Sequence, residues 1–190
     1  DRLRAEGIPF EVGGPSGLFR HDAAQRVGRL FAWFADHPWP QDRYDASQNL
    51  TGDDVLNTAL ADCLGKNDRR LRDRLRRLKK DALDGRFSNL AELYQELLVA
   101  IGMSALDPAV RVDAALLSVY GRFNELLNDF EAMTRRMSAD PVRGRGSRKL
   151  NWPRTLEGLA WYLTLYATQS YEESAAQDSS GVDAVQIATI

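Results

Sequence analysis

The stretch DPAVRVDAALLSVYGRFNELLNDFEAMTRRM, residues 107–137, decides the fold class. Its first two residues are a strong helix start, because aspartate caps free N–H groups and proline fits the first turn. Apolar side chains then recur every three or four residues, which places them on one face of a helix. These are Val112, Leu116, Val119, Phe123, Leu126, Phe130, Met133 and Met137. We predict the longest helix of the chain here.

The same periodicity extends to both sides of this stretch. Asp22 is a predicted N-cap, and prolines at 38 and 40 end the helix that it starts. Asn89 with Glu92 resembles a capping box. The predicted helices cover residues 22–36, 53–64, 69–83, 89–101, 107–137 and 151–171.

Short strand patterns lie at the two ends of the chain. Ile8–Val12 is one, and Val185–Ile190, after a predicted polar linker over Gln177–Asp183, is the other. Strands need neighbours, and almost everything between them is helical. The order predicts a mostly α fold, a helical bundle inserted between strand fragments of a larger α/β sheet domain.

Composition limits the chemistry. The 190 residues are 44% hydrophobic with a net charge of −2, so attraction to nucleic acid must come from local clusters. One cysteine, Cys63, and two histidines exclude a disulfide framework and a cysteine zinc site. We find no signal peptide and no apolar run of membrane-spanning length. These observations predict the cytoplasm, and the excess of arginine over lysine favours a bacterial source.

Two basic segments are candidate DNA contacts. The first, residues 66–80, offers guanidinium groups suited to phosphate oxygens, and a solvated surface helix explains it equally well. The second, residues 135–154, contains glycine and serine and is predicted to be a basic loop. If both segments together contacted about five phosphates, affinity would fall by two to three orders of magnitude between roughly 50 and 200 mM salt. The candidates are Arg69, Arg72, Arg76, Arg77, Arg143, Arg145, Arg148 and Lys149.

The other motifs give weaker evidence for a functional site. The turn Gly13–Gly17 follows a strand pattern but lacks the Lys-Ser/Thr ending of a P-loop, so a structural turn is favoured over a phosphate site. No Ser-His-Asp grouping in the sequence has a supporting motif around it. The four tryptophans could stack on bases, and their positions among leucines favour the core for most of them.

Both ends carry a family resemblance. VQIATI, residues 185–190, resembles the start of a motif that continues T-x-H-x-A-K-G-L-E in UvrD/Rep/PcrA-type superfamily 1 DNA helicases. GIPFEVGGPSGLF, residues 7–19, resembles the strand, glycine turn and helix earlier in the same RecA-like domain of that family. In those helicases the two elements bracket a helical insertion, the 2B subdomain.

The resemblance implies a domain plan and a function. Residues 1–37 and 184–190 would belong to the second RecA-like (2A) domain, and 38–183 would be the 2B subdomain. The parent protein would be an ATP-dependent 3′→5′ DNA helicase that uses ATP and Mg²⁺, binds single-stranded DNA and duplex junctions, and contacts other proteins through its helices. Thr189 matches the motif threonine beside the single-stranded DNA path. No catalytic or cofactor-binding residue falls in this chain, so the fragment alone would be inactive.

A free-standing helical protein–protein interaction module without a motor is the alternative. The helicase hypothesis predicts that the gene continues with a His-x-Ala-Lys-Gly stretch. The alternative predicts that Val185–Ile190 ends the gene or pairs with Ile8–Val12.

Overall fold

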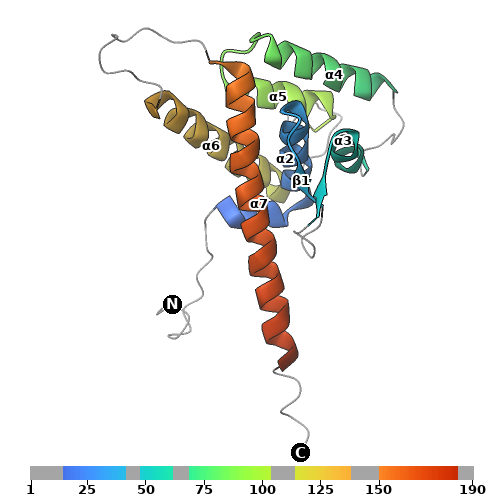
Figure 1. The fold of residues 1–190 in the computed structure, drawn as a ribbon, viewed down its shortest axis with the longest axis vertical. Coiled ribbons are helices and arrows are strands. Elements are labelled where there is room, and N and C mark those ends of the chain that lie inside the picture. The colour runs from blue at the N-terminus through green and yellow to red at the C-terminus, as the bar shows by residue number, and fades with distance from the viewer. Residues whose placement is uncertain (1–14, 42–47, 62–68, 104–113, 138–149, 184–190) are drawn as a thin grey trace, which may run out of the picture.

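The computed structural model describes residues 15–41, 48–61, 69–103, 114–137 and 150–183. These residues are mostly helical, with six α-helices, one 3₁₀ helix and a two-stranded antiparallel pair (Figure 1). The mostly α fold class is therefore confirmed. The elements are η1 (Pro15–Arg20), α2 (Asp22–Phe34), β1 (Trp39–Pro40), β2 (Asn49–Leu50), α3 (Asp53–Leu60), α4 (Arg69–Leu83), α5 (Leu90–Ala100), α6 (Ala114–Met137) and α7 (Trp152–Asp183).

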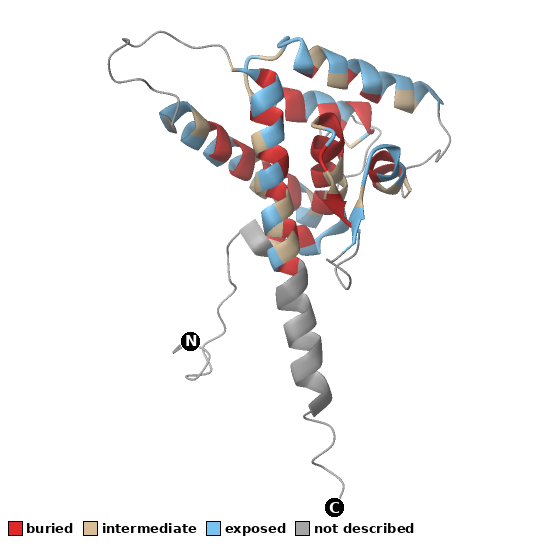
Figure 2. Ribbon diagram, in the orientation of Figure 1, coloured by how far each residue is buried: buried red, intermediate tan, exposed pale blue. Residues whose placement is uncertain are grey.

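Helix α2 is the centre of the core. Nine of its 13 residues are buried, and it packs on η1, α3, α6 and α7. Burial of this helix on several sides follows from its sequence, since apolar residues fill most of its circumference. Figure 2 shows the buried residues of the neighbouring helices gathered around it.

Aromatic rings join the helices of the core. The Phe123 ring of α6 stacks on Phe31 of α2, with 6.1 Å between ring centroids, and on Tyr94 of α5 at 5.4 Å. Phe19 of η1 meets Phe123 edge-on at 6.0 Å. All four side chains are fully or almost fully buried, and burial raises the pKa of Tyr94 well above its ordinary value. One continuous core thus joins η1 and α2 to the helices that follow residue 38.

A small β-hairpin, which the sequence did not predict, covers one side of α2. Trp39 pairs with Leu50 in the antiparallel register, and its fully buried indole Nε1 donates to Gln25 Oε1 at 3.1 Å. The same glutamine donates from Nε2 to the Phe19 carbonyl at 2.7 Å. Gly28 leaves the space that the Trp39 ring occupies, because a Cβ atom there would overlap it. Buried polar atoms paired in this way fix the hairpin against the helix.

The predicted helix starts at Asp22, Asp53 and Asn89 are confirmed to within a residue. Asn89 Oδ1 accepts from the Glu92 N–H at 2.8 Å, and the Glu92 carboxylate accepts from the N–H of Ser88 at 2.6 Å, one residue before the expected partner. The proposed start at Asp107 and both terminal strands lie outside the described residues.

Two predictions about the last helix are wrong. Helix α7 continues to Asp183 instead of ending near Tyr171, so residues 177–183 are helical and not a linker. It has 32 residues, against 24 in the part of α6 that the structure describes. The segment after residue 171 contains no proline, and its glutamate, alanine and glutamine residues favour extension of a helix that is already formed. Its C-terminal part extends away from the other helices (Figure 1).

Candidate nucleic-acid interface

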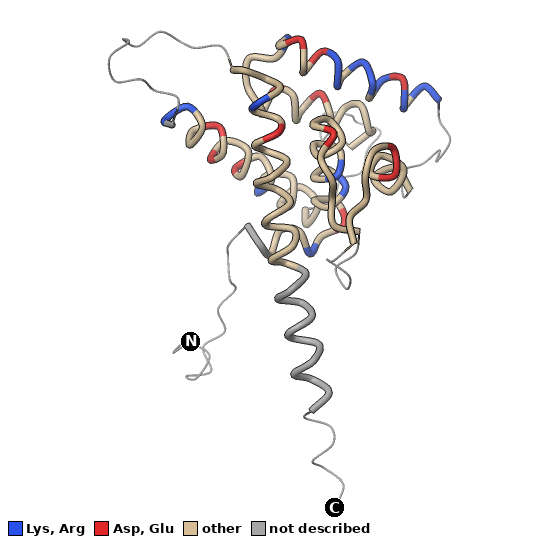
Figure 3. The backbone as a smooth tube through the Cα atoms, in the orientation of Figure 1, with Lys and Arg blue, Asp and Glu red and all other residues tan. Residues whose placement is uncertain are grey.

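Helix α4 carries the densest charge of the described structure. Its sequence RRLRDRLRRLKKDAL has eight basic and two acidic side chains. Only Leu75, Leu78 and Ala82 are buried, on the face that contacts α5 and α7. Lysine and arginine therefore follow almost the whole outer length of the helix (Figure 3).

Two of the basic side chains attach α4 to its neighbours. Lys79 Nζ donates to the Trp33 carbonyl at 2.7 Å and to Asp36 Oδ1 at 2.6 Å, and it lies 4.8 Å from the centroid of the Trp33 ring. Arg72 donates to Asn57 Oδ1 of α3 at 2.8 Å. Since these groups are used in packing, Arg72 is less available to phosphate than the sequence predicted.

A second set of basic side chains faces solvent. Arg69, Arg76 and Lys80 occupy positions i, i+7 and i+11, close to one line along the helix, with Arg77 beside them. We call Arg69, Arg76, Arg77 and Lys80 the outer basic face. Asp73 lies within it, 3.9 Å from Arg69 Nε and 3.5 Å from Arg76 Nη1.

The outer basic face lacks enough acid to balance it. Arg76 and Lys80 stand four residues apart, where like charges destabilise a helix by a few tenths of a kcal/mol. The exposed ion pairs with Asp73 contribute little stability in compensation, because water and salt screen them. A polyanion would relieve this repulsion and release its own counterions.

The second basic segment is described only at its edges. Arg135 binds the Glu131 carboxylate, which also accepts from the Leu90 N–H at 2.7 Å, so this pair joins α6 to the start of α5. Arg136 is exposed at the end of α6. The remaining predicted contacts, Arg143, Arg145, Arg148, Lys149 and Thr189, lie outside the described residues, so only the four α4 candidates are placed on one element.

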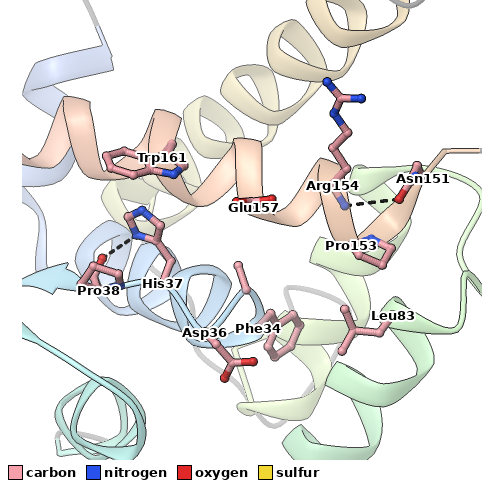
Figure 4. Close-up of a pocket in the computed structure, with 11 residues that line it drawn as sticks. Phe34, Asp36, His37, Pro38, Leu83, Asn151, Pro153, Arg154, Glu157 and Trp161 are labelled. Carbon is pink, nitrogen blue, oxygen red and sulfur yellow. Dashed lines mark hydrogen bonds between the residues drawn. The ribbon is translucent and has the colours of Figure 1, made fainter.

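A groove opens where the C-terminal ends of α2 and α4 meet the start of α7. Its volume is about 780 Å³ (Figure 4). Phe34, Pro38 and Leu83 give it apolar walls, and the remaining lining residues are Ala35, Asp36, His37, Asn151, Pro153, Arg154, Glu157 and Trp161. The sequence patterns did not predict this groove.

The end of α2 forms one edge of the groove. The His37 N–H donates to the Ala32 carbonyl at 2.9 Å and the Asp36 N–H to the Trp33 carbonyl at 3.2 Å, which is a Schellman motif. Asp36 takes the left-handed position, with φ at 52°, where glycine is usual. Its carboxylate would be unfavourable beside a helix C-terminus, and the Lys79 ammonium offsets this.

His37 and Trp161 lie together at the same edge. His37 Nδ1 is 2.7 Å from the Pro38 carbonyl oxygen, and since a carbonyl only accepts, Nδ1 carries a hydrogen. His37 Nε2 is buried without a hydrogen-bond partner among the described residues. The two rings meet edge-on, with centroids 4.6 Å apart.

Trp161 departs from the expectation that the tryptophans are core. Trp33, Trp39 and Trp152 are buried, whereas 63% of Trp161 is exposed. The sequence spacing could have indicated this exposure. Arg154, Glu157 and Trp161 are separated by three and four residues, which places the tryptophan on the polar side of α7.

Within the described ranges, no three or more His, Cys, Asp or Glu residues form a group that could hold a metal ion. The helices described there also include none that is long and apolar enough to cross a membrane. No family model, curated protein or solved structure matches the chain.

Proposed function

We propose that this chain is a DNA-contacting helical subdomain and that the outer basic face of α4 binds the phosphate backbone. The observation that carries the proposal is the row of exposed cations on one helix of a protein whose overall charge is −2. Guanidinium and ammonium groups suit phosphate oxygens, and backbone contacts of this kind need no base sequence.

The proposal extends to the parent protein through the resemblance at the chain ends. It assigns the chain to the 2B subdomain, with flanking strips of the 2A domain, of a bacterial cytoplasmic ATP-dependent 3′→5′ DNA helicase similar to UvrD. ATP hydrolysis and its Mg²⁺ would then be supplied by other parts of that protein, and the subdomain would contact duplex DNA at the junction. Of the residues that carry the resemblance, the described structure includes only 15–19, which form part of η1.

The DNA contact can be tested by fluorescence anisotropy with a forked DNA of mixed sequence. The double variant Arg76→Glu/Lys80→Glu should weaken binding by about 10- to 100-fold at low salt, since two attractive contacts become repulsive. The matched control is Arg20→Glu/Arg86→Glu, which changes the net charge equally at exposed positions outside both the outer basic face and residues 135–154. Equal losses in the two variants would show that only total charge matters, and would contradict the proposal.

A protein-binding module is the second candidate, and one observation favours it. Trp161 and Leu165, one turn apart on α7, are 63% and 56% exposed. Exposed apolar neighbours of this size are common at protein interfaces. If the chain is a protein-binding module, Leu165→Glu should abolish binding to its protein partner and leave the affinity for DNA unchanged.

A further inference from the structure

We infer that the groove between α2, α4 and α7 holds an unpaired base of single-stranded nucleic acid, stacked on Trp161. The inference rests on the proposed function, because it places a base beside the phosphate-binding helix. The groove would distinguish single-stranded from duplex nucleic acid. The outer basic face alone cannot make this distinction, because it contacts only phosphates.

Trp161 provides the stacking surface. A ring that is 63% exposed gains little from packing within this chain, yet its edge contact with His37 limits its rotation. Such a ring can accept a base at a small cost in conformational entropy. Stacking of a base on an aromatic side chain is tolerant of sequence and strong enough to retain a single strand.

The polar groups of the groove suit the edge of a base. Glu157 is exposed, and its carboxylate forms no hydrogen bond or ion pair with the described residues, so it can accept from an amino group such as that of cytosine. His37 Nε2 is also without a hydrogen-bond partner among the described residues, and it stays buried while the two rings remain in edge contact. Figure 4 shows Trp161 over His37, with Glu157 one turn away on the same helix.

The cations nearest the groove belong to the start of α7 and to α4. The Arg154 guanidinium extends outward from the rim of the groove and makes no ion pair with the described residues (Figure 4). On the facing wall at the same end, Leu83 of α4 lines the groove and follows Lys80 of the outer basic face by three residues. A strand that continues from the bound base toward α4 would therefore pass the Arg154 guanidinium.

The groove is expected to favour an unpaired base over a base in a duplex. Its volume of about 780 Å³ falls within the range of about 300–1,000 Å³ that is typical of small-molecule sites. A base inside a duplex is stacked and paired, and freeing it costs a few kcal/mol. An unpaired base enters without that cost, so we expect the groove to add affinity only for single strands.

Tryptophan fluorescence tests the inference, because Trp161 is the exposed tryptophan and the other three are buried. Oligo(dC) of 12 nucleotides should quench the emission in a saturable way, and a blunt 12-base-pair duplex should not. Trp161→Phe should remove the quenching and keep single-strand affinity within about threefold, since phenylalanine still stacks. Trp161→Ala should lower single-strand affinity by about 5- to 100-fold and leave duplex affinity unchanged.

Leu165→Ala is the matched control, one turn along the same exposed face, and it should change neither affinity. Equal quenching by the duplex, or a Trp161→Ala variant with unchanged single-strand affinity, would overturn the inference while leaving phosphate binding by α4 intact. Absence of binding to any DNA would overturn both proposals. Quenching by a lysine-rich peptide and not by oligo(dC) would overturn the inference in favour of a protein ligand.

Discussion

Helices α2 and α4 have similar lengths and opposite characters. In α2, nine of 13 residues are buried, and in α4 only three of 15 are. Packing accounts for the nine buried residues of α2 and for the three buried residues of α4. The remaining side chains of α4 include six exposed cations, and packing does not explain them. The contrast separates residues that maintain the fold from residues available to a ligand.

The two helices are joined at one charged contact. The side chain of Lys79 extends from α4 to the C-terminal end of α2, where its ammonium group donates to both the Trp33 carbonyl and the Asp36 carboxylate. This contact also fixes one edge of the groove. The orientation of the outer basic face relative to the groove therefore depends on it.

The largest expected effect is on stability and falls on α2. Phe31→Ala removes a fully buried ring that stacks on Phe123, and it should lower the free energy of unfolding by about 3–5 kcal/mol. Leu71→Ala, at a half-buried position of α4, should cost about 1–2 kcal/mol, since less apolar area is lost. Urea denaturation measures both. Equal losses would contradict the division between a core helix and a surface helix.

The next largest effect on stability is expected at the contact between Lys79 of α4 and Asp36 at the end of α2. Lys79→Met keeps much of the side-chain volume and removes two charge-assisted hydrogen bonds, so unfolding should become easier by about 1–2 kcal/mol. Asp36→Gly relieves the left-handed backbone and loses the ion pair, so alone it should change stability little. In the Lys79→Met background the same change should become stabilising. An identical effect of Asp36→Gly in both backgrounds would show that the two residues are not coupled.

A smaller effect concerns the single acid within the outer basic face. Asp73→Asn removes the carboxylate that Arg69 and Arg76 share, and it should tighten binding to forked DNA by about two- to fivefold. Glu125→Gln, on the exposed surface of α6, changes net charge equally and should leave affinity almost unchanged. Anisotropy titrations at a fixed low salt concentration distinguish the two, and equal tightening would contradict a localised site.

The smallest effect separates two arginines of α4 itself. Arg72→Ala loses the bond to Asn57 and should lower stability by about 0.5–1 kcal/mol. Arg74 is exposed and has no partner among the described residues, so Arg74→Ala should stay within about 0.5 kcal/mol of the parent. Thermal unfolding of both variants provides the comparison, and a larger loss at Arg74 would argue against the contact that we describe.

Local sequence patterns predicted much of the fold and part of the site. Caps and apolar spacing located α2, α4 and α5, because these signals act within one or two turns of helix. The charge of α4 was visible as well, although its division into packing cations such as Lys79 and outer cations such as Arg76 depends on where α2 and α3 lie. The groove escaped prediction because it forms from three helix ends that are distant in sequence. The far end of α7 was missed because its polar composition resembles a linker.

The central claim is that the outer basic face of α4 binds phosphate, and the salt dependence of forked-DNA affinity tests it most directly. If four cations contact phosphates, the affinity should fall by about 100-fold between roughly 50 and 200 mM salt. In Arg76→Glu/Lys80→Glu the slope of log affinity against log salt should become shallower by about two, and in Arg20→Glu/Arg86→Glu it should not change. An affinity that does not depend on salt, or an identical slope in both double variants, would contradict the claim.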